Sequence, residues 1–184
     1  MQDEAWLAFS ERISCEDSLP LQCERIEWPL PASELQRLAE RNANTLATIA
    51  ALEERRKEGV DENNPLLQEM TRLDAKLTAL VEIVNRVLLP AQGLPPRQSI
   101  RFNAIGAVLP AGLLGGAPSV MLRLHPDACP TLPLEFPAKV VRHLDDGGVF
   151  VVFAAMGESA SDAIERFVFR LHRRKVAETR HSAL

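Results

Sequence analysis

The apolar positions between Leu66 and Val87 recur at alternating spacings of four and three residues. This spacing is typical of the seam of a coiled coil. The a positions of the heptads hold Met70, Leu77 and Val84. The d positions hold Leu66, Leu73, Leu80 and Val87. The pattern predicts one long helix that carries a continuous apolar stripe along one side.

The stripe is wider than the seam of a two-stranded coil, which usually keeps charged residues on the flanking e and g positions. Here, apolar residues take several of these positions: Leu67, Val81, Ile83 and Leu88. Burying so broad a stripe requires neighbours on both sides. We expect several copies of the helix to bundle together, and one copy to pack in addition against another helix of the same chain. The alternative is an ordinary amphipathic helix on a globular core, since the seam spans only about three heptads.

A second helical pattern precedes this one. Ser33 followed by Gln36 forms a capping box, and Gly59 is a natural C-terminal stop. Between them, apolar residues occur at helical spacing: Leu35, Leu38, Leu46, Ile49 and Leu52. Two long helices joined by a short polar loop predict a helical hairpin over residues 32–90. Residues 1–31 form an N-terminal extension, with a short helix over 5–13 and an extended stretch over 19–28.

The periodicity becomes strand-like after a Pro- and Gly-rich linker at residues 91–96. Short apolar segments bounded by turn residues follow: 99–103, 107–109, 120–125, 134–143 and 149–154. Strands at this spacing predict a small antiparallel barrel or sandwich. A final helix, capped by Ser159 or Ser161, carries one apolar face: Ile164, Phe167, Val168 and Leu171. The fold class is therefore α+β, with the barrel and its helix over residues 97–184.

Composition and charge narrow the class of protein. The net charge of −4 over 184 residues argues against a general nucleic-acid binder. Eleven Lys or Arg and eight Asp or Glu lie from Arg97 onward, which gives +3 there and leaves −7 before it. Three cysteines without metal-type spacing are typical of reduced cytosolic thiols. The start of the chain resembles no signal peptide, and no stretch of about twenty apolar residues occurs. We expect a cytoplasmic protein without a membrane span.

The sequence offers little catalytic or metal-binding chemistry. It contains no nucleophile elbow, no phosphate loop and no tuned carboxylate pair, so we expect a protein that is not an enzyme and has no cofactor. His125, Asp127 and Cys129 could supply three metal ligands, but no fourth is evident, which favours an ordinary loop. The closing helix has a basic face of Arg166, Arg170, Arg173, Arg174 and Lys175. Positive charge in the last turns suits the helix dipole and favours a solvated face.

Five segments of the second half resemble a PilZ domain: residues 100–109, 119–124, 138–142, 149–153 and 163–174. The helical half resembles the extension of the atypical, tetramer-forming PilZ proteins of xanthomonads, in which a heptad-bearing helix bundles four chains. The resemblance implies a six-stranded PilZ-type β-barrel, coiled-coil self-association and a role in bacterial cyclic di-GMP signalling.

PilZ domains usually bind cyclic di-GMP through an Arg-x-x-x-Arg loop and an Asp-x-Ser-x-x-Gly motif. On this sequence the second motif falls at residues 101–106: Gly106 matches, Asn103 replaces the serine, and Arg101 stands where the aspartate belongs. This reverses the charge at a guanine-reading position. Arg97 and Arg101 have the spacing of the first motif but overlap the second. They are either a nucleotide-binding pair or two exposed arginines on one face of a strand.

The leading hypothesis is a non-enzymatic homotetramer that acts as a scaffold or adaptor for a signalling protein partner, with a motility or virulence output. It would not bind cyclic di-GMP through the usual motifs. The alternative is a cyclic di-GMP receptor that uses Arg97, Arg101 or the basic helix. A third hypothesis, an unrelated barrel that binds single-stranded nucleic acid, is disfavoured by the negative charge and the scarcity of aromatic residues.

Overall fold

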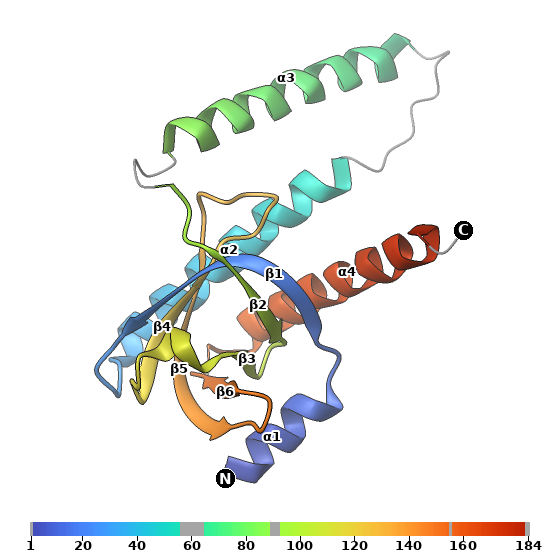
Figure 1. Cartoon of the computed structure of the whole chain (residues 1–184). Helices are drawn as coiled ribbons and strands as arrows, with labels where there is room; N and C mark the ends of the chain where they lie inside the picture. Colours follow the sequence, from blue (N-terminus) through green and yellow to red (C-terminus); the bar gives the residue numbers. More distant parts are fainter. Residues whose placement is uncertain (1, 56–64, 89–92, 155, 183–184) are drawn as a thin grey trace.

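The computed structural model describes residues 2–55, 65–88, 93–154 and 156–182. Six antiparallel strands form a closed barrel in the order β1-β2-β3-β6-β5-β4 (Figure 1). The strands are β1 (Cys15–Arg25), β2 (Arg97–Phe102), β3 (Gly106–Pro110), β4 (Ser119–Leu124), β5 (Leu134–His143) and β6 (Gly148–Phe153). Closure leaves no strand edge unpaired, which is how a small all-antiparallel sheet avoids edge-to-edge association. The predicted six-stranded barrel is confirmed.

The first strand corrects the division made from the sequence, because β1 lies within the supposed N-terminal extension, residues 1–31. Its first half pairs with β2, from Cys15 opposite Phe102 onward, and its second half pairs with β4 up to Arg25. The stretch is extended as predicted. Its place in the barrel was missed because its partners lie far along the chain, where local patterns give no information about pairing. Residues 97–184 alone supply five of the six strands.

The barrel interior is filled with aliphatic and phenylalanine side chains. Those almost completely buried include Leu19, Ile100, Phe102, Leu122, Phe136 and Val151. The rings of Phe136 and Phe153 stack with their centroids 4.4 Å apart. The 3₁₀ turn η1 (Ala111–Leu114) follows β3 and adds Leu114 to the same core. Alternating inward residues from all strands thus complete one core within a single chain.

Two helices add apolar residues to this core. Helix α4 (Glu158–Ser182) buries the predicted face of Ile164, Phe167, Val168 and Leu171. Helix α2 (Ala32–Arg55) contributes Leu46 and Ile49 and packs on α4 and β5. The apolar face of α2 therefore serves the barrel. From the sequence we expected another helix of the chain to pack against the broad stripe of the heptad helix. The apolar face of α2 packs on the barrel instead.

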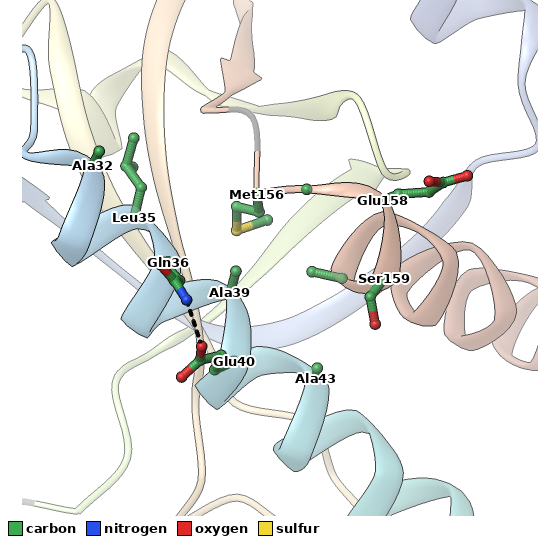
Figure 2. Close-up of a pocket in the computed structure, with 11 residues that line it drawn as sticks. Ala32, Leu35, Gln36, Ala39, Glu40, Ala43, Met156, Glu158 and Ser159 are labelled. Carbon is green, nitrogen blue, oxygen red and sulfur yellow. Dashed lines mark hydrogen bonds between the residues drawn. The ribbon is translucent and has the colours of Figure 1, made fainter.

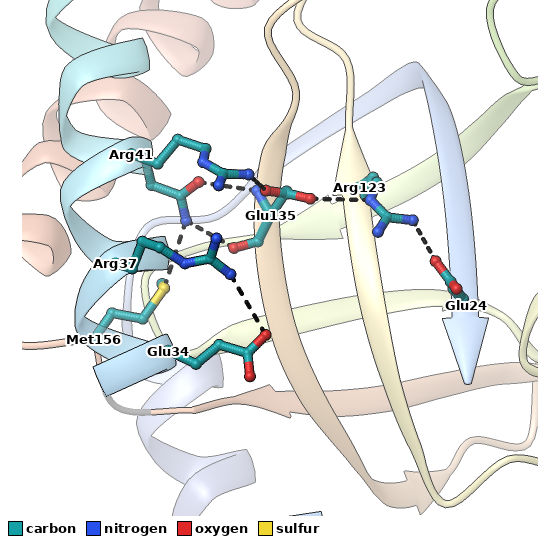
Figure 3. A network of polar contacts seen from close by, with 8 residues as sticks. Glu24, Glu34, Arg37, Arg41, Arg123, Glu135 and Met156 are labelled. Atoms are coloured by element: carbon teal, nitrogen blue, oxygen red, sulfur yellow. Dashed lines mark hydrogen bonds and ion pairs between the residues drawn. The ribbon is translucent and has the colours of Figure 1, made fainter. Parts of the chain in front are cut away.

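A chain of polar contacts ties α2 to three strands (Figure 3). The Glu135 carboxylate on β5 accepts hydrogen bonds from Arg41 of α2 at 2.5 Å and from Arg123 of β4 at 3.0 Å. Arg123 also donates to Glu24 of β1 at 2.5 Å. Asn42 binds the backbone of Glu135 twice, donating to its carbonyl at 2.8 Å and accepting from its amide at 2.9 Å. These bonds fix α2 in register with the sheet.

Helix α3 (Pro65–Leu88) forms where the heptads predicted it and lies apart from the barrel (Figure 1). Six seam residues are between 45% and 76% exposed: Met70, Leu73, Leu77, Leu80, Val84 and Val87. The side chain of Leu66 lies outside the described part. Asn85 attaches α3 to the β4–β5 loop, accepting a hydrogen bond from the Thr131 hydroxyl at 2.5 Å. The predicted stop at Gly59, the polar turn after it and the first two residues of the linker, 91 and 92, also lie outside the described residues.

Candidate functional site

The turn between β2 and β3 carries the two small residues of the expected nucleotide motif. The Asn103 side chain is buried; it accepts a hydrogen bond from the Ile105 amide and donates one to the Phe9 carbonyl, both at 2.9 Å. Gly106 lies against β6, and a Cβ placed on it would be 2.1 Å from the Val151 carbonyl oxygen. Both residue types are therefore required by the fold: an amide that bonds in two directions, and a residue without a side chain.

Helix α1 (Gln2–Glu11) covers the outer surface of this part of the barrel. Phe9 is buried, with its ring centroid 4.9 Å from that of Phe150, and the Trp6 ring meets the same phenylalanine edge-on at 5.2 Å. The Arg101 guanidinium carbon lies 5.3 Å from the Phe9 ring centroid and 5.9 Å from that of Trp6. Arg142 adds a second guanidinium 5.7 Å from Trp6. Cation–π attraction thus helps to hold α1 on the barrel.

The role of α1 was missed from the sequence, although a signal was present. Trp6 and Phe9 are three residues apart in a predicted helix and therefore share one face. An aromatic face on a short helix predicts packing on a larger body. What it packs on, and that Arg101 and Arg142 border the contact, depends on barrel closure and could not be inferred locally.

Arg97, at the start of β2, is engaged elsewhere. Its two terminal nitrogens bind the two carboxylate oxygens of Asp127 at 2.8 and 3.1 Å, and one of them also donates to the Ser18 carbonyl. The hydrogen bond to Asp127 raises the pKa of Arg97 above its ordinary value. A paired fork of this kind is among the stronger side-chain contacts. Arg97 and Arg101 therefore bind different elements, the β4–β5 loop and α1.

The basic face of α4 borders a cavity of about 480 Å³ between α4, the end of α2 and the β4–β5 loop. Arg170, Arg173 and Arg174 line it, together with Asp127 and Glu53. The Glu53 carboxylate accepts a hydrogen bond from Arg170 at 3.0 Å and lies 3.9 Å from Arg174. The interpretation of this face as purely solvated is incomplete, because a carboxylate from α2 neutralises part of it.

A second cavity, of about 460 Å³, separates the first turns of α2 and α4 (Figure 2). Its lining is mostly small and apolar: Ala32, Leu35, Ala39, Ala43 and Met156. Gln36, Glu40, Glu158 and Ser159 add polar side chains to the lining, and Gln36 and Glu40 bind one another at 3.0 Å. The described residues that line this cavity include no cationic side chain and no histidine.

The His125–Cys129 segment lies in the loop between β4 and β5. The His125 ring nitrogen Nδ1 lies 2.7 Å from the Pro130 carbonyl oxygen, and the buried Cys129 thiol lies 3.8 Å from the Asn85 side-chain oxygen. Among the described residues, no group of three or more His, Cys, Asp or Glu side chains is arranged to hold a metal ion. Cys15, Cys23 and Cys129 are free thiols.

Residues 44–181 match the family model of the atypical PilZ domain, which is described as a cyclic di-GMP receptor. The chain belongs to the atypical PilZ family. Its fold is similar to the crystal structure of a pathogenic protein from Xanthomonas campestris, with a TM-score of 0.69 and 24% sequence identity, covering 95% of this chain and 97% of the other. That protein is described as a tetrameric PilZ domain self-assembled via an unusual helical bundle. No curated protein matches this chain.

In this PilZ protein the positions aligned with the usual nucleotide motif have structural partners. Asn103 and Gly106 build the β2–β3 turn, and Arg101 lies against the aromatic rings of α1. Their part in nucleotide binding stays a prediction. None of the described helices combines the length and the apolar character needed to cross a membrane.

Proposed function

We propose that this PilZ protein is a non-enzymatic homotetramer whose copies are joined through α3. It acts in the cytoplasm as a scaffold or adaptor in cyclic di-GMP signalling, with motility or virulence as its output. In this proposal the barrel with α1, α2 and α4 presents the signalling surface, and α3 with its heptads is the oligomerisation element. The usual binding of cyclic di-GMP through Arg101, Asn103 and Gly106 is not part of this function.

The observation that carries the proposal is the exposure of the α3 seam. Leu73, Leu80 and Val84 each expose about half of their surface in the single chain, whereas α2 and α4 bury their apolar faces on the barrel. Continuous apolar patches of this kind mark interaction surfaces. The helical bundle of the Xanthomonas campestris protein supports a homotypic partner.

Sedimentation velocity of the full chain tests the assembly. We expect a tetramer for the wild type and a monomer when Leu73, Leu77 and Leu80 are all changed to serine, because each seam position loses its apolar contacts. The matched control changes Arg72 and Ala75, which occupy c and f positions on the opposite side of α3, to serine and should stay tetrameric. A wild-type monomer, or a tetramer that survives the seam substitutions, would refute the proposal.

The nucleotide part of the proposal rests on the contacts of the motif positions. A ligand that used Arg101 would have to displace it from Trp6 and Phe9, and one that used the turn would meet the buried Asn103. Isothermal titration of the full chain with cyclic di-GMP should therefore give no saturable heat.

A saturable heat would favour the second candidate function, a receptor that binds the dinucleotide through other residues. The cavity beside Arg170, Arg173 and Arg174 supports this candidate, since guanidinium groups suit phosphates. In that case Arg173→Ala should abolish the heat, while Arg101→Ala should leave it unchanged.

A further inference from the structure

A third cavity opens between the α1–β1 linker, the β2–β3 turn and α4. It measures about 500 Å³, within the range of sites that take an inserted side chain or small ligand. Its apolar lining comes from Ile13, Ala104, Val168 and Phe169. Ile13 is 55% and Phe169 is 48% exposed. A large aromatic side chain left open beside a cavity is the kind of anchor that dominates protein–protein contacts.

The charges around this cavity have one predominant sign. Arg12 and Arg166 line it together with Glu165, which pairs with Arg12. The guanidinium carbon of Arg173 lies 5.9 Å from the Phe169 ring centroid. Three guanidiniums against one carboxylate give a local charge of +2 on a chain whose net charge is −4. This surface therefore complements an acidic partner with apolar side chains.

We propose that this cavity is a docking site for an acidic segment of a partner protein, which inserts a large apolar side chain beside Phe169 and pairs its carboxylates with Arg166 and Arg173. The site goes beyond the proposed self-assembly and does not require it.

Two observations favour a different protein over a second copy of this chain as the occupant. A contact between two such surfaces would bring two local charges of +2 together, which opposes association. Helices α1 and α3 also lie at opposite ends of the barrel (Figure 1), so the cavity beside the end of α1 is distant from the proposed seam. Both surfaces can therefore be occupied at the same time.

The test uses the full chain and two fluorescein-labelled peptides of equal length, followed by fluorescence anisotropy. One peptide alternates glutamate with leucine and phenylalanine, and the other has lysine in place of every glutamate. We expect the acidic peptide to bind at least tenfold more tightly than the basic one, a difference of about 1.4 kcal/mol. Addition of the acidic peptide should also shift the methyl NMR signals of Ile13 and Val168.

Variants locate the site. Phe169→Ala and Ile13→Ala should each weaken binding of the acidic peptide about tenfold or more, and both should fold, because both side chains are about half exposed. Arg166→Glu should reduce the preference for the acidic peptide. The matched control is Leu132→Ala, which removes an exposed leucine on the β4–β5 loop and should bind like the wild type.

Several outcomes would overturn the proposal. The proposal would be refuted if both peptides bound equally tightly or if neither bound. It would also be refuted if Leu132→Ala weakened binding of the acidic peptide as much as Phe169→Ala. Dissociation of the oligomer by Phe169→Ala, measured by sedimentation, would show that a second copy occupies it. Failure of the α3 seam substitutions to produce monomers concerns only the assembly, because the peptide measurements do not depend on it.

Discussion

The barrel and α3 differ in the exposure of their apolar side chains. Phe136 and Leu122 are fully buried by strands and helices of the same chain, whereas Leu80 and Val87 of α3 are 56% and 76% exposed. The stabilisation of the barrel is therefore complete in one copy and independent of concentration. Any stabilisation gained by covering α3 comes from other molecules and depends on concentration. The comparison teaches that a strong apolar pattern predicts burial, but not whether the partner is the same chain.

The largest effect should separate the two regions directly. Phe136→Ala removes a ring that stacks on Phe153, and we expect it to lower the free energy of unfolding by about 3–5 kcal/mol. Leu80→Ala in α3 should leave barrel unfolding nearly unchanged at low protein concentration. Guanidinium unfolding followed by tryptophan fluorescence reports on the barrel, since Trp28 contacts Lys139 of β5. Equal losses of unfolding free energy in the two variants would contradict the distinction between a barrel that is stable in one chain and a helix whose apolar side chains are exposed.

The ion pairs of the barrel and of α3 should also differ strongly in how much they contribute to the free energy of unfolding. The Glu135 side chain is 10% exposed and binds both Arg41 and Arg123. Glu135→Ala should lower the free energy of unfolding by about 1.5–3 kcal/mol, because two charged donors lose their acceptor.

The control for this prediction is the exposed pair on α3, in which Glu69 and Arg72 lie 3.9 Å apart. Glu69→Ala should change the free energy of unfolding by less than about 0.5 kcal/mol. The same denaturation measurement serves for both variants. A similar effect in the two would mean that the contacts between α2 and the barrel contribute no more than a surface pair.

Gly106 tests whether the motif position belongs to the closed barrel. Gly106→Ala places a methyl group against the Val151 carbonyl, and we expect a loss of about 1–3 kcal/mol in the free energy of unfolding, with no change in oligomeric state. Gly112→Ala is the control, since a Cβ there meets no atom within 4 Å. If Gly106→Ala were as stable as the control, the glycine would not be required by the fold.

Much of this architecture could be predicted from local patterns. Strand β5 has the predicted bounds, α4 buries the predicted face, and α3 runs through the predicted heptads. In each case the apolar spacing within one element contains the information. That the stripe of α3 is too wide for one partner helix stays a prediction.

The rest depended on contacts between distant segments. The place of β1 follows from pairing with β2 and β4, and α2 faces the barrel because Asn42 and Arg41 meet Glu135 on β5. The roles of the motif positions were likewise hidden. The spacing of Arg97 and Arg101 did not predict that Arg97 would bind Asp127 or that Arg101 would lie against the aromatic rings of α1. Such partners are set by barrel closure, which no local window contains.

A pH-dependent effect on stability is expected from the thiol of Cys15, at the start of β1. Burial raises its pKa from 9.0 to about 11, with the nearby Asp17 carboxylate acting in the same direction. The folded barrel therefore favours the neutral thiol, and this contribution to stability is full below pH 9 and lost as the pH rises toward 11. Helix α3 has no cysteine, so the proposed assembly through this helix should not respond to the titration.

Unfolding measured in reductant between pH 8 and 11 should show this loss in the wild type, and Cys15→Ala should reduce its slope. Sedimentation over the same range separates the barrel from the proposed assembly. If the slope of unfolding free energy against pH were unchanged in Cys15→Ala, other groups would be responsible for the loss of stability at alkaline pH. If the wild type, but not Cys15→Ala, lost the proposed tetramer together with barrel stability, the two regions would be coupled. Their separation into a concentration-independent barrel and a concentration-dependent helix would then not hold.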